Sequence, residues 1–324
     1  MRGTKDEPII SIIIPVKDGE PWIRQCIEGI LSQTISDIVE IIALDSGSRD
    51  NTRKILSGYP VNLIDIPPSE FNHGRTRNVG VKAARGKFVL LTVQDAAAYD
   101  RLWVERLYDV LKDESVAAVC GSQVVPHNCR MNPVEWFRPV SRSSIRTYQL
   151  DSNQPFGKYS PFERRRMAGW DDVNAMYRRS ALLSLPFREV VYGEDAYWAK
   201  DALEAGFKIA YQPEARVYHY HQQNYDYAFK RFLTTMYLRY KAFEYIEPYP
   251  SLDARKLKGF VGAIFLKGKG LDFSDKVKWF RYNITVIKAR QAAHRSFTKA
   301  LELGEEELMR THEKFCGKPP VPLS

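Results

Sequence analysis

Short apolar runs and stretches of helical periodicity alternate along the first half of the chain. Apolar runs rich in β-branched residues predict strands that are buried on both faces, and four such runs are Ile9–Ile14, Val39–Leu44, Val61–Ile66 and Phe88–Val93. Between these runs, apolar residues recur at helical spacing over Pro21–Leu31 and Thr76–Arg85, and a further helix after the second strand is predicted to end at Leu56. Because strands and helices alternate, we predict an α/β fold with a doubly wound, mostly parallel sheet.

The pattern loosens after the fourth strand and changes again near residue 225. The remaining elements predicted in the first part are helices over Leu102–Leu111 and Asp195–Ala205 and strands over Val116–Cys120, Val173–Tyr177 and Lys208–Tyr211. Residues 126–169 are polar, aromatic and rich in arginine, and a connection of that length is usually functional or mobile. Beyond Asn224 the pattern is helical. We therefore predict a first domain over 1–224 and a helical, basic region over 225–324.

Composition narrows the class of protein. Of the 324 residues, 44% are apolar and 27% are charged, which is typical of a soluble globular protein and argues against disorder. The apolar run Phe260–Leu266 is far shorter than the roughly 20 residues of a membrane span. Met1–Pro8 lacks the apolar core of a signal peptide. The four cysteines are widely spaced, which argues against a thiolate zinc site. We expect a cytoplasmic protein.

The positive charge is concentrated in one segment. Residues 251–300 hold 12 Lys or Arg and three Asp or Glu, a balance of +9 that equals the net charge of the whole chain. Arg255–Lys267 and Lys276–Lys288 mix these cations with Trp, Phe and Ile. Such stretches can lie on an anionic membrane surface or bind nucleic acid. The alternative is a pair of helices that pack on the body and present a solvated basic face.

Two of the predicted strand ends carry acidic residues. Asp45 ends the second strand and begins the sequence Asp-Ser-Gly-Ser, and Asp95 follows the fourth strand. Ligands of doubly wound sheets bind beyond the carboxyl ends of the strands. A carboxylate there can accept hydrogen bonds from a nucleobase or a ribose. A strand-to-helix turn capped by Asp50 is the alternative for the first of these sites.

Basic residues precede the third predicted helix. The sequence Phe-Asn-His-Gly-Arg-Thr-Arg-Asn spans 71–78 and places Arg75 and Arg77 near the helix N-terminus. Two arginines at such a place can clamp a diphosphate. A solvated basic turn is the alternative.

In this order, the segments resemble the inverting family 2 glycosyltransferases of the GT-A fold. The string Phe-Asn-His-Gly-Arg-Thr-Arg-Asn and the triplet Gln-Asp-Ala at 94–96 resemble the bacterial rhamnosyltransferase branch of that family. Trp170–Ser180 resembles the family segment that lines the acceptor side, and Tyr192–Trp198 resembles its Glu-Asp motif. The resemblance covers roughly residues 9–224 and implies a GT-A transferase domain.

The resemblance implies roles for particular residues. Those expected to bind the nucleotide sugar are Pro15, Lys17, Asp45, Ser46, Arg75, Arg77, Gln94 and Asp95. Those expected on the acceptor side are Trp170, Asp172, Asn174 and Glu194. In the Glu-Asp motif, the aspartate that acts as the family's general base corresponds to Asp195. A carboxylate suits this role because an inverting transfer is one in-line displacement in which a base removes the proton of the acceptor hydroxyl. A helix N-cap is the alternative for Asp195.

The resemblance also implies a divalent cation, Mg²⁺ or Mn²⁺. The family commonly uses a histidine 24 residues after the base as a ligand, and this spacing selects His219, with His221 as the alternate. Most members have Asp-x-Asp at the fourth strand end, whereas this chain has Val93-Gln94-Asp95 and keeps one carboxylate. We predict a cation held by Asp95, His219 and diphosphate oxygens. Surface or aromatic packing of the two histidines is the alternative.

We predict an inverting glycosyltransferase that moves L-rhamnose from dTDP-β-L-rhamnose to a hydroxyl of a bacterial surface polysaccharide or lipid-linked glycan. One alternative is the same fold with a UDP-hexose donor. Another is a non-catalytic subunit that docks a polysaccharide synthesis complex at the membrane. Because the resemblance implies a lipid-linked acceptor, we expect residues 251–300 to meet an anionic membrane surface at the inner face of the cell membrane. We do not expect a nucleic-acid partner.

Overall fold

The computed structural model describes residues 8–128, 131–136, 144–151 and 153–317. Contacts within the chain divide it into two units. The first unit comprises Met1–Val124 and Val140–His219, and the second comprises Val125–Pro139 and Tyr220–Ser324. The second unit thus takes in part of the polar, arginine-rich segment 126–169.

The first unit is built on one mixed sheet. Its described strands are ordered β3-β2-β1-β4-β8-β6-β9-β5, and β7 also pairs with β9. The parallel pairing of β1 with β2 and β4, and of β2 with β3, agrees with the prediction, whereas β8 runs antiparallel to both β4 and β6. The strands are β1 (Ile10–Val16), β2 (Val39–Asp45), β3 (Val61–Asp65), β4 (Phe88–Thr92), β5 (Ala97–Ala98), β6 (Val116–Val124), β7 (Arg146–Tyr148), β8 (Asn174–Arg178) and β9 (Lys208–Tyr218).

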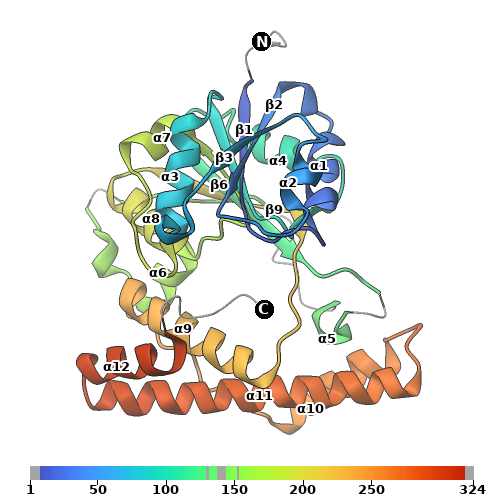
Figure 1. Ribbon diagram of the computed structural model, residues 1–324. Coiled ribbons are helices and arrows are strands. Elements are labelled where there is room, and N and C mark those ends of the chain that lie inside the picture. Colours follow the sequence, from blue (N-terminus) through green and yellow to red (C-terminus); the bar gives the residue numbers. More distant parts are fainter. Residues whose placement is uncertain (1–7, 129–130, 137–143, 152, 318–324) are drawn as a thin grey trace. The chain divides into compact units, whose positions relative to one another are not determined.

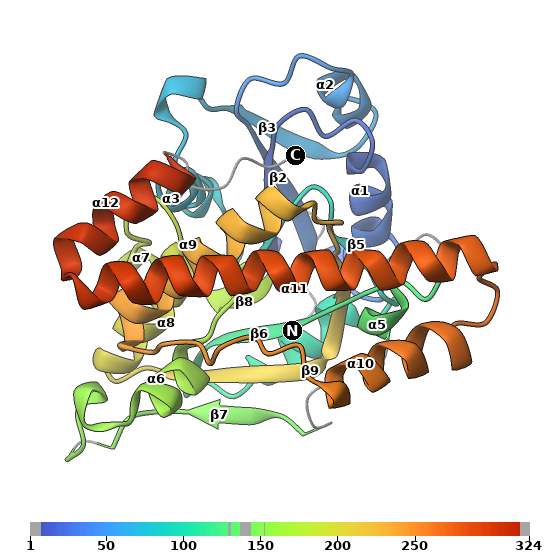
Figure 2. The ribbon, with the colours of Figure 1, turned by 90° about the horizontal axis from the view of Figure 1, so that it is seen from below.

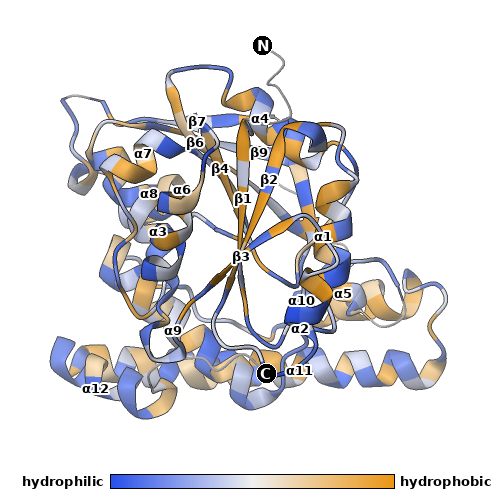
Figure 3. Ribbon diagram, turned by 45° about the horizontal axis from the view of Figure 1, so that its top comes forward, coloured by the Kyte–Doolittle hydropathy of each residue, from blue (hydrophilic) through white to orange (hydrophobic). Residues whose placement is uncertain are grey.

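Helices cover both faces of this sheet (Figure 1). They are α1 (Ile23–Leu31), α2 (Thr52–Leu56), α3 (His73–Ala83), α4 (Trp103–Val110), α6 (Pro161–Ala168), α7 (Arg179–Ser184) and α8 (Glu194–Glu204). Ile12 of β1 lies in a core cluster with residues of α1 and α4. Its neighbour Ile13 faces Gly80 of α3 on the other side. Because both faces are covered, β1 is apolar at nearly every position, and the strands form a hydrophobic centre (Figure 3).

The helix α3 begins three residues earlier than predicted. Asn72 caps it, because its side-chain oxygen accepts a hydrogen bond from the backbone N–H of Arg75 at 3.1 Å. Arg75 therefore belongs to the helix itself rather than to the turn before it, and Arg77 lies in the helix as predicted.

The second unit is helical in the residues that the structure describes. Its elements are α5 (Pro133–Trp136), α9 (Tyr225–Phe243), α10 (Ala254–Val261), a π-helical turn (Gly262–Leu266), α11 (Phe273–Glu302) and α12 (Glu305–Cys316). The long helix α11 lies beside α9, α10 approaches its beginning and α12 folds back along its end (Figure 2). Phe297 of α11 packs with Leu233 and Met236 of α9, which buries the apolar face of each helix. Among the described residues, we find no helix both long and apolar enough to span a membrane.

Candidate active site

The side chain of Gln94 joins the ends of β1 and β4. Its amide oxygen accepts a hydrogen bond from the Lys17 backbone N–H at 2.9 Å, and its amide nitrogen donates to the Lys17 carbonyl at 2.9 Å. Pro15 is a member of β1 and pairs with Leu44 of β2. The side chain of Lys17 is exposed just beyond β1. Gln94 therefore holds two strand ends together, and Lys17 offers its ammonium group at the edge of the sheet where a ligand is expected.

Asp45 lies at the predicted strand end but is 1% exposed. One of its carboxylate oxygens accepts hydrogen bonds from the Ser48 N–H at 3.1 Å and the Ser48 hydroxyl at 2.6 Å. The other accepts from Arg53 at 2.7 Å. Ser46 is also buried and donates to the Val16 carbonyl. Protein groups thus occupy both oxygens of Asp45, and this favours a role in shaping the turn over direct contact with a base or ribose.

Arg75 and Arg77 lie on the same helix in opposite environments. Arg75 is exposed, and its guanidinium pairs with Glu70 at 2.7 Å. Arg77 is only 5% exposed; it forms an ion pair with Glu194, and its Nε lies 3.4 Å from a carboxylate oxygen of Asp172. A buried guanidinium is tolerated because it is paired. The geometry therefore favours Arg77 as a support for Glu194 and Asp172 over the predicted contact with a diphosphate.

The predicted base, Asp195, is the second residue of α8. Gly193 precedes the helix with φ 83°, a left-handed conformation that favours glycine, and is the N-cap residue. No side-chain cap hydrogen bond is present at this helix start, so the alternative of an Asp195 N-cap is wrong. One Asp195 oxygen accepts from the Ala196 N–H at 2.7 Å, and the other accepts from the Asp172 N–H at 3.4 Å.

The pKa of Asp195 is shifted toward neutrality. Burial raises its pKa to about 6, the negative charge of Asp171 adds to the rise, and Arg77 opposes it. A carboxyl group with a pKa near the operating pH combines a substantial ionised fraction with useful basicity. Asp195 can therefore accept a proton under physiological conditions.

The predicted acceptor-side residues form a buried support behind Asp195. Asp172 is 1% exposed and accepts a hydrogen bond from the Tyr177 hydroxyl, which in turn accepts from Trp170 Nε1 at 2.6 Å. Burial raises the pKa of Asp172 to about 7, Arg77 opposes the shift and Asp195 adds to it. Asn174 accepts from Trp103 at 2.7 Å and donates to the Ala215 carbonyl at 2.8 Å. These side chains are therefore placed to orient the site from within the core.

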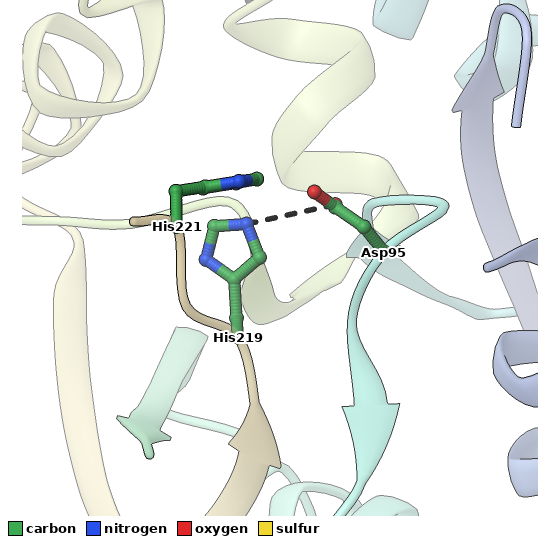
Figure 4. A group of neighbouring side chains, drawn as sticks. All are labelled: Asp95, His219 and His221. Carbon is green, nitrogen blue, oxygen red and sulfur yellow. Dashed lines mark ion pairs between the residues drawn. The ribbon is translucent and has the colours of Figure 1, made fainter. Parts of the chain in front are cut away.

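A group of possible metal ligands lies at the end of β9. Asp95, His219 and His221 each offer one ligand atom, and these atoms lie within 4.8 Å of one another (Figure 4). The Nε2 atom of His219 is 3.5 Å from a carboxylate oxygen of Asp95. The pairing of Ala97 in β5 with Tyr218 in β9 brings Asp95 and His219 together. The sequence indicates these three residues as possible ligands, but it gives no sign of this two-residue strand.

Two further polar residues adjoin this group, and the sequence analysis did not single them out. Gln123, near the end of β6, bonds through its amide oxygen with His219 Nδ1 at 2.7 Å, and its amide nitrogen donates to Asp171. The repeat Asp171-Asp172 was a signal that could have drawn attention to the first aspartate. The sequence carries no comparable signal at Gln123, because only the pairing of β6 with β9 brings it near His219.

Comparison with known proteins identifies the family. The family model described as glycosyl transferase family 2 matches residues 11–184, more than half of the chain. The chain therefore belongs to glycosyl transferase family 2. The predicted family and the predicted enzyme class, a glycosyltransferase, are confirmed.

Two relatives carry the name O-antigen chain rhamnosyltransferase. WbaN of Salmonella anatum is 35% identical over 201 residues, which are 60% of this chain and 61% of WbaN. RfbN of Salmonella typhimurium is 30% identical over 232 residues, which are 70% of this chain and 71% of RfbN. The chain is thus aligned with about six to seven tenths of each relative.

Solved structures are similar in fold at low sequence identity. Residues 1–349 of TarS from S. aureus match with a TM-score of 0.53 and 15% identity, over 90% of this chain and 91% of that chain. The mannosyltransferase PcManGT from Pyrobaculum calidifontis, solved with GDP-Man and Mn²⁺, matches with a TM-score of 0.51 and 17% identity, over 94% and 78% of the two chains. The predicted GT-A fold class with a helical C-terminal region is confirmed.

Proposed function

We propose that this protein transfers L-rhamnose from dTDP-β-L-rhamnose to a hydroxyl group of a bacterial surface polysaccharide or its lipid-linked precursor, with inversion. The observation that carries the proposal is Asp195, a half-buried acid with a pKa of about 6 at the start of α8 in a family 2 fold. The names of the two Salmonella relatives support rhamnose as the sugar and a polysaccharide as the product.

In this mechanism, Asp195 accepts the proton of the acceptor hydroxyl while the hydroxyl oxygen attacks the anomeric carbon and the nucleotide diphosphate leaves from the opposite face. The Asp172 N–H, which lies 3.4 Å from Asp195, helps to orient its carboxylate. Lys17 and Arg75 are exposed at the strand ends and at the start of α3. Their positive charges suit the diphosphate of the donor.

The donor atoms at Asp95 and His219 fit a divalent cation. A carboxylate oxygen and an imidazole nitrogen 3.5 Å apart, with His221 close by, form a mixed oxygen and nitrogen set. Such a set suits Mn²⁺, because imidazole is a better ligand for Mn²⁺ than for Mg²⁺. Asp95 and His219 would hold the ion, with His221 as the alternate. When bound, the ion supplies positive charge that stabilises the leaving diphosphate.

A donor screen on the full chain tests the proposal. We expect dTDP-L-rhamnose with Mn²⁺ to raise the thermal unfolding midpoint more than UDP-glucose, UDP-N-acetylglucosamine or GDP-mannose, because a ligand at about 100 times its Kd stabilises a fold by about 2.7 kcal/mol. Preferential stabilisation by a UDP-hexose would favour the alternative donor. No stabilisation by any of these nucleotide sugars would favour the non-catalytic subunit.

The second unit carries a surface that suits an anionic membrane. Leu266, at the end of the π-helical turn, is 78% exposed, and Phe273, at the start of α11, is 75% exposed. Exposed cations Lys267, Lys269 and Lys278 occur in the same stretch of chain. Exposed apolar side chains flanked by lysines can insert at the boundary between headgroups and acyl chains. We therefore propose peripheral binding at the inner face of the cell membrane, near a lipid-linked acceptor.

Vesicle binding separates this surface from a merely solvated helix face. The wild type should sediment with phosphatidylcholine vesicles that contain phosphatidylglycerol and not with phosphatidylcholine alone, since each lysine near an anionic surface contributes about 1 kcal/mol. The variant K267E/K269E/K278E should lose this binding. The matched control K54E/K82E/K87E changes charge equally on exposed lysines of the first unit and should keep it. No binding of the wild type at low salt would contradict the proposal.

A further inference from the structure

The contact between Gln123 and His219 has a definite hydrogen-bond direction. Both carboxylate oxygens of Asp171 are acceptors, since one accepts from the Val173 N–H at 3.0 Å and the other accepts from the Gln123 amide. A carboxylate cannot donate. The Gln123 amide must therefore present its nitrogen to Asp171 and its oxygen to His219.

This orientation decides the tautomer of His219. The amide oxygen of Gln123 lies 2.7 Å from His219 Nδ1 and can only accept, so Nδ1 must carry the proton. In the neutral ring the other nitrogen, Nε2, then keeps its lone pair. Nε2 is also the atom that lies 3.5 Å from Asp95 (Figure 4). The lone pair thus points to the place where a cation between these two residues would lie.

We infer that Gln123 is a positioning residue for His219. Asp171 orients the Gln123 amide, and the amide oxygen accepts the hydrogen bond from His219 Nδ1 and so holds the imidazole in the tautomer able to bind a metal. The inference rests on the proposed metal site and adds a residue to it. Partners that fix the second ring nitrogen of a metal-binding histidine are known to matter, and their loss typically lowers metal affinity about 10- to 100-fold.

The geometry favours Gln123 for this role over a purely structural one. Its side chain is exposed, so the hydrogen bonds to His219 and Asp171 contribute little to the core. Its backbone is already fixed in β6, where it pairs with Val217 of β9. A substitution at Gln123 should therefore leave the fold intact while it removes the acceptor for His219 Nδ1.

The test measures the tautomer directly in the metal-free full chain. Two-bond ¹H–¹⁵N spectra of the protein with ¹⁵N-labelled histidine, recorded at mildly alkaline pH, distinguish the Nδ1–H form from the Nε2–H form. The His219 signals are assigned by their loss in His219→Ala. We expect the Nδ1–H form in the wild type and a shift toward the Nε2–H form in Gln123→Leu. A wild type in the Nε2–H form would overturn the inference.

Metal affinity gives the second readout. Titration with Mn²⁺, followed by electron paramagnetic resonance, should show a loss of about 10- to 100-fold in Gln123→Leu. The double variant Gln123→Glu/Asp171→Asn should recover most of the affinity, because the introduced carboxylate still accepts from His219 and the introduced amide can donate to that carboxylate. The matched control Gln149→Leu loses an exposed glutamine that donates to the Gly206 carbonyl at 3.0 Å and should bind Mn²⁺ as the wild type does.

The two readouts separate failure of this inference from failure of the proposed metal site. If the wild type binds no Mn²⁺, the metal site is wrong, and the histidine spectra still decide whether Gln123 sets the tautomer. If the wild type binds Mn²⁺ and Gln123→Leu changes neither the affinity nor the tautomer, the metal site stands and the role of Gln123 is wrong.

Discussion

The two units of this protein use charged side chains in opposite ways. In the first unit, Arg77, Asp172 and Glu194 are each less than 10% exposed and are held in one buried cluster. In the second unit, Lys267, Lys269 and Lys278 stand exposed on a helical framework. A buried charge is costly unless it is paired, whereas an exposed one is nearly free. Buried, paired charges such as Arg77 can shift the pKa of a neighbouring acid. Exposed lysines can attract an anionic partner, with a strength that depends on how many of them there are.

The largest effect that this comparison predicts lies at the acid next to the buried cluster. Asp195→Asn should lower the rate of sugar transfer by about 10²- to 10⁴-fold, because the amide cannot accept the proton of the acceptor hydroxyl. Donor binding, measured by thermal shift, should be unchanged because the side chain keeps its size. Turnover above about a tenth of the wild-type rate at saturating donor would mean that Asp195 is not the base.

Removal of a proposed metal ligand should have the next largest effect. Asp95→Ala and His219→Ala should each lower Mn²⁺ affinity by more than the roughly 10- to 100-fold expected for a supporting residue. The difference from the wild type in donor binding should shrink once EDTA has removed the metal. His127→Ala, an exposed histidine of the second unit, serves as the control. Unchanged Mn²⁺ affinity in His219→Ala would instead point to His221 or to a metal-independent transfer.

A smaller effect is expected from pH, with a sign set by the buried cluster. The base acts in its ionised form, and its pKa is raised to about 6, so kcat/KM should fall about tenfold per pH unit below that value. Asp171→Asn removes a negative charge that raises the pKa of Asp195. The acid limb of the profile should therefore move to lower pH. A limb that stays in place in Asp171→Asn would show that another group controls it.

The smallest effect is expected from the exposed lysines when no membrane is present. K267E/K269E/K278E should change the rate of transfer to a short soluble acceptor by no more than about twofold. Substitutions at exposed positions away from a site rarely change the free energy of unfolding by more than about 0.5 kcal/mol, so the fold should stay intact. The same variant should lose activity on an acceptor embedded in anionic vesicles. A large loss on the soluble acceptor would show that these lysines serve the reaction itself and would break the distinction between the two units.

The pattern of apolar residues along the chain was sufficient to predict the central strands of the first unit. The apolar run Ile9–Ile14 predicts β1, and the apolar runs that end at Leu44 and Val93 place Asp45 and Asp95 just beyond the second and fourth strands. Apolar periodicity works because it reports which side chains leave water, and this is decided within a few neighbouring residues. The segment Val173–Tyr177 was also predicted as a strand, but its antiparallel direction depends on how a long connection returns to the sheet.

The environments of Arg75 and Arg77 could not be predicted from the sequence. Arg75 and Arg77 are two positions apart and were assigned the same role, yet one is exposed and the other is buried. Only the packing of α3 near α8 supplies Glu194 and Asp172 as partners for Arg77. No local pattern encodes a partner that is more than 90 residues away in the chain.

The sequence by itself determined where the buried strands lie along the chain, the family motifs and the concentration of charge over 251–300. The tertiary structure alone decided which polar groups meet. The two-residue strand β5 sets Asp95 beside His219, and the pairing of β6 with β9 sets Gln123 against the same imidazole. The physical reason is that burial is a property of each stretch of chain, whereas hydrogen bonds and ion pairs depend on distances of a few ångströms between stretches that only the completed fold brings together.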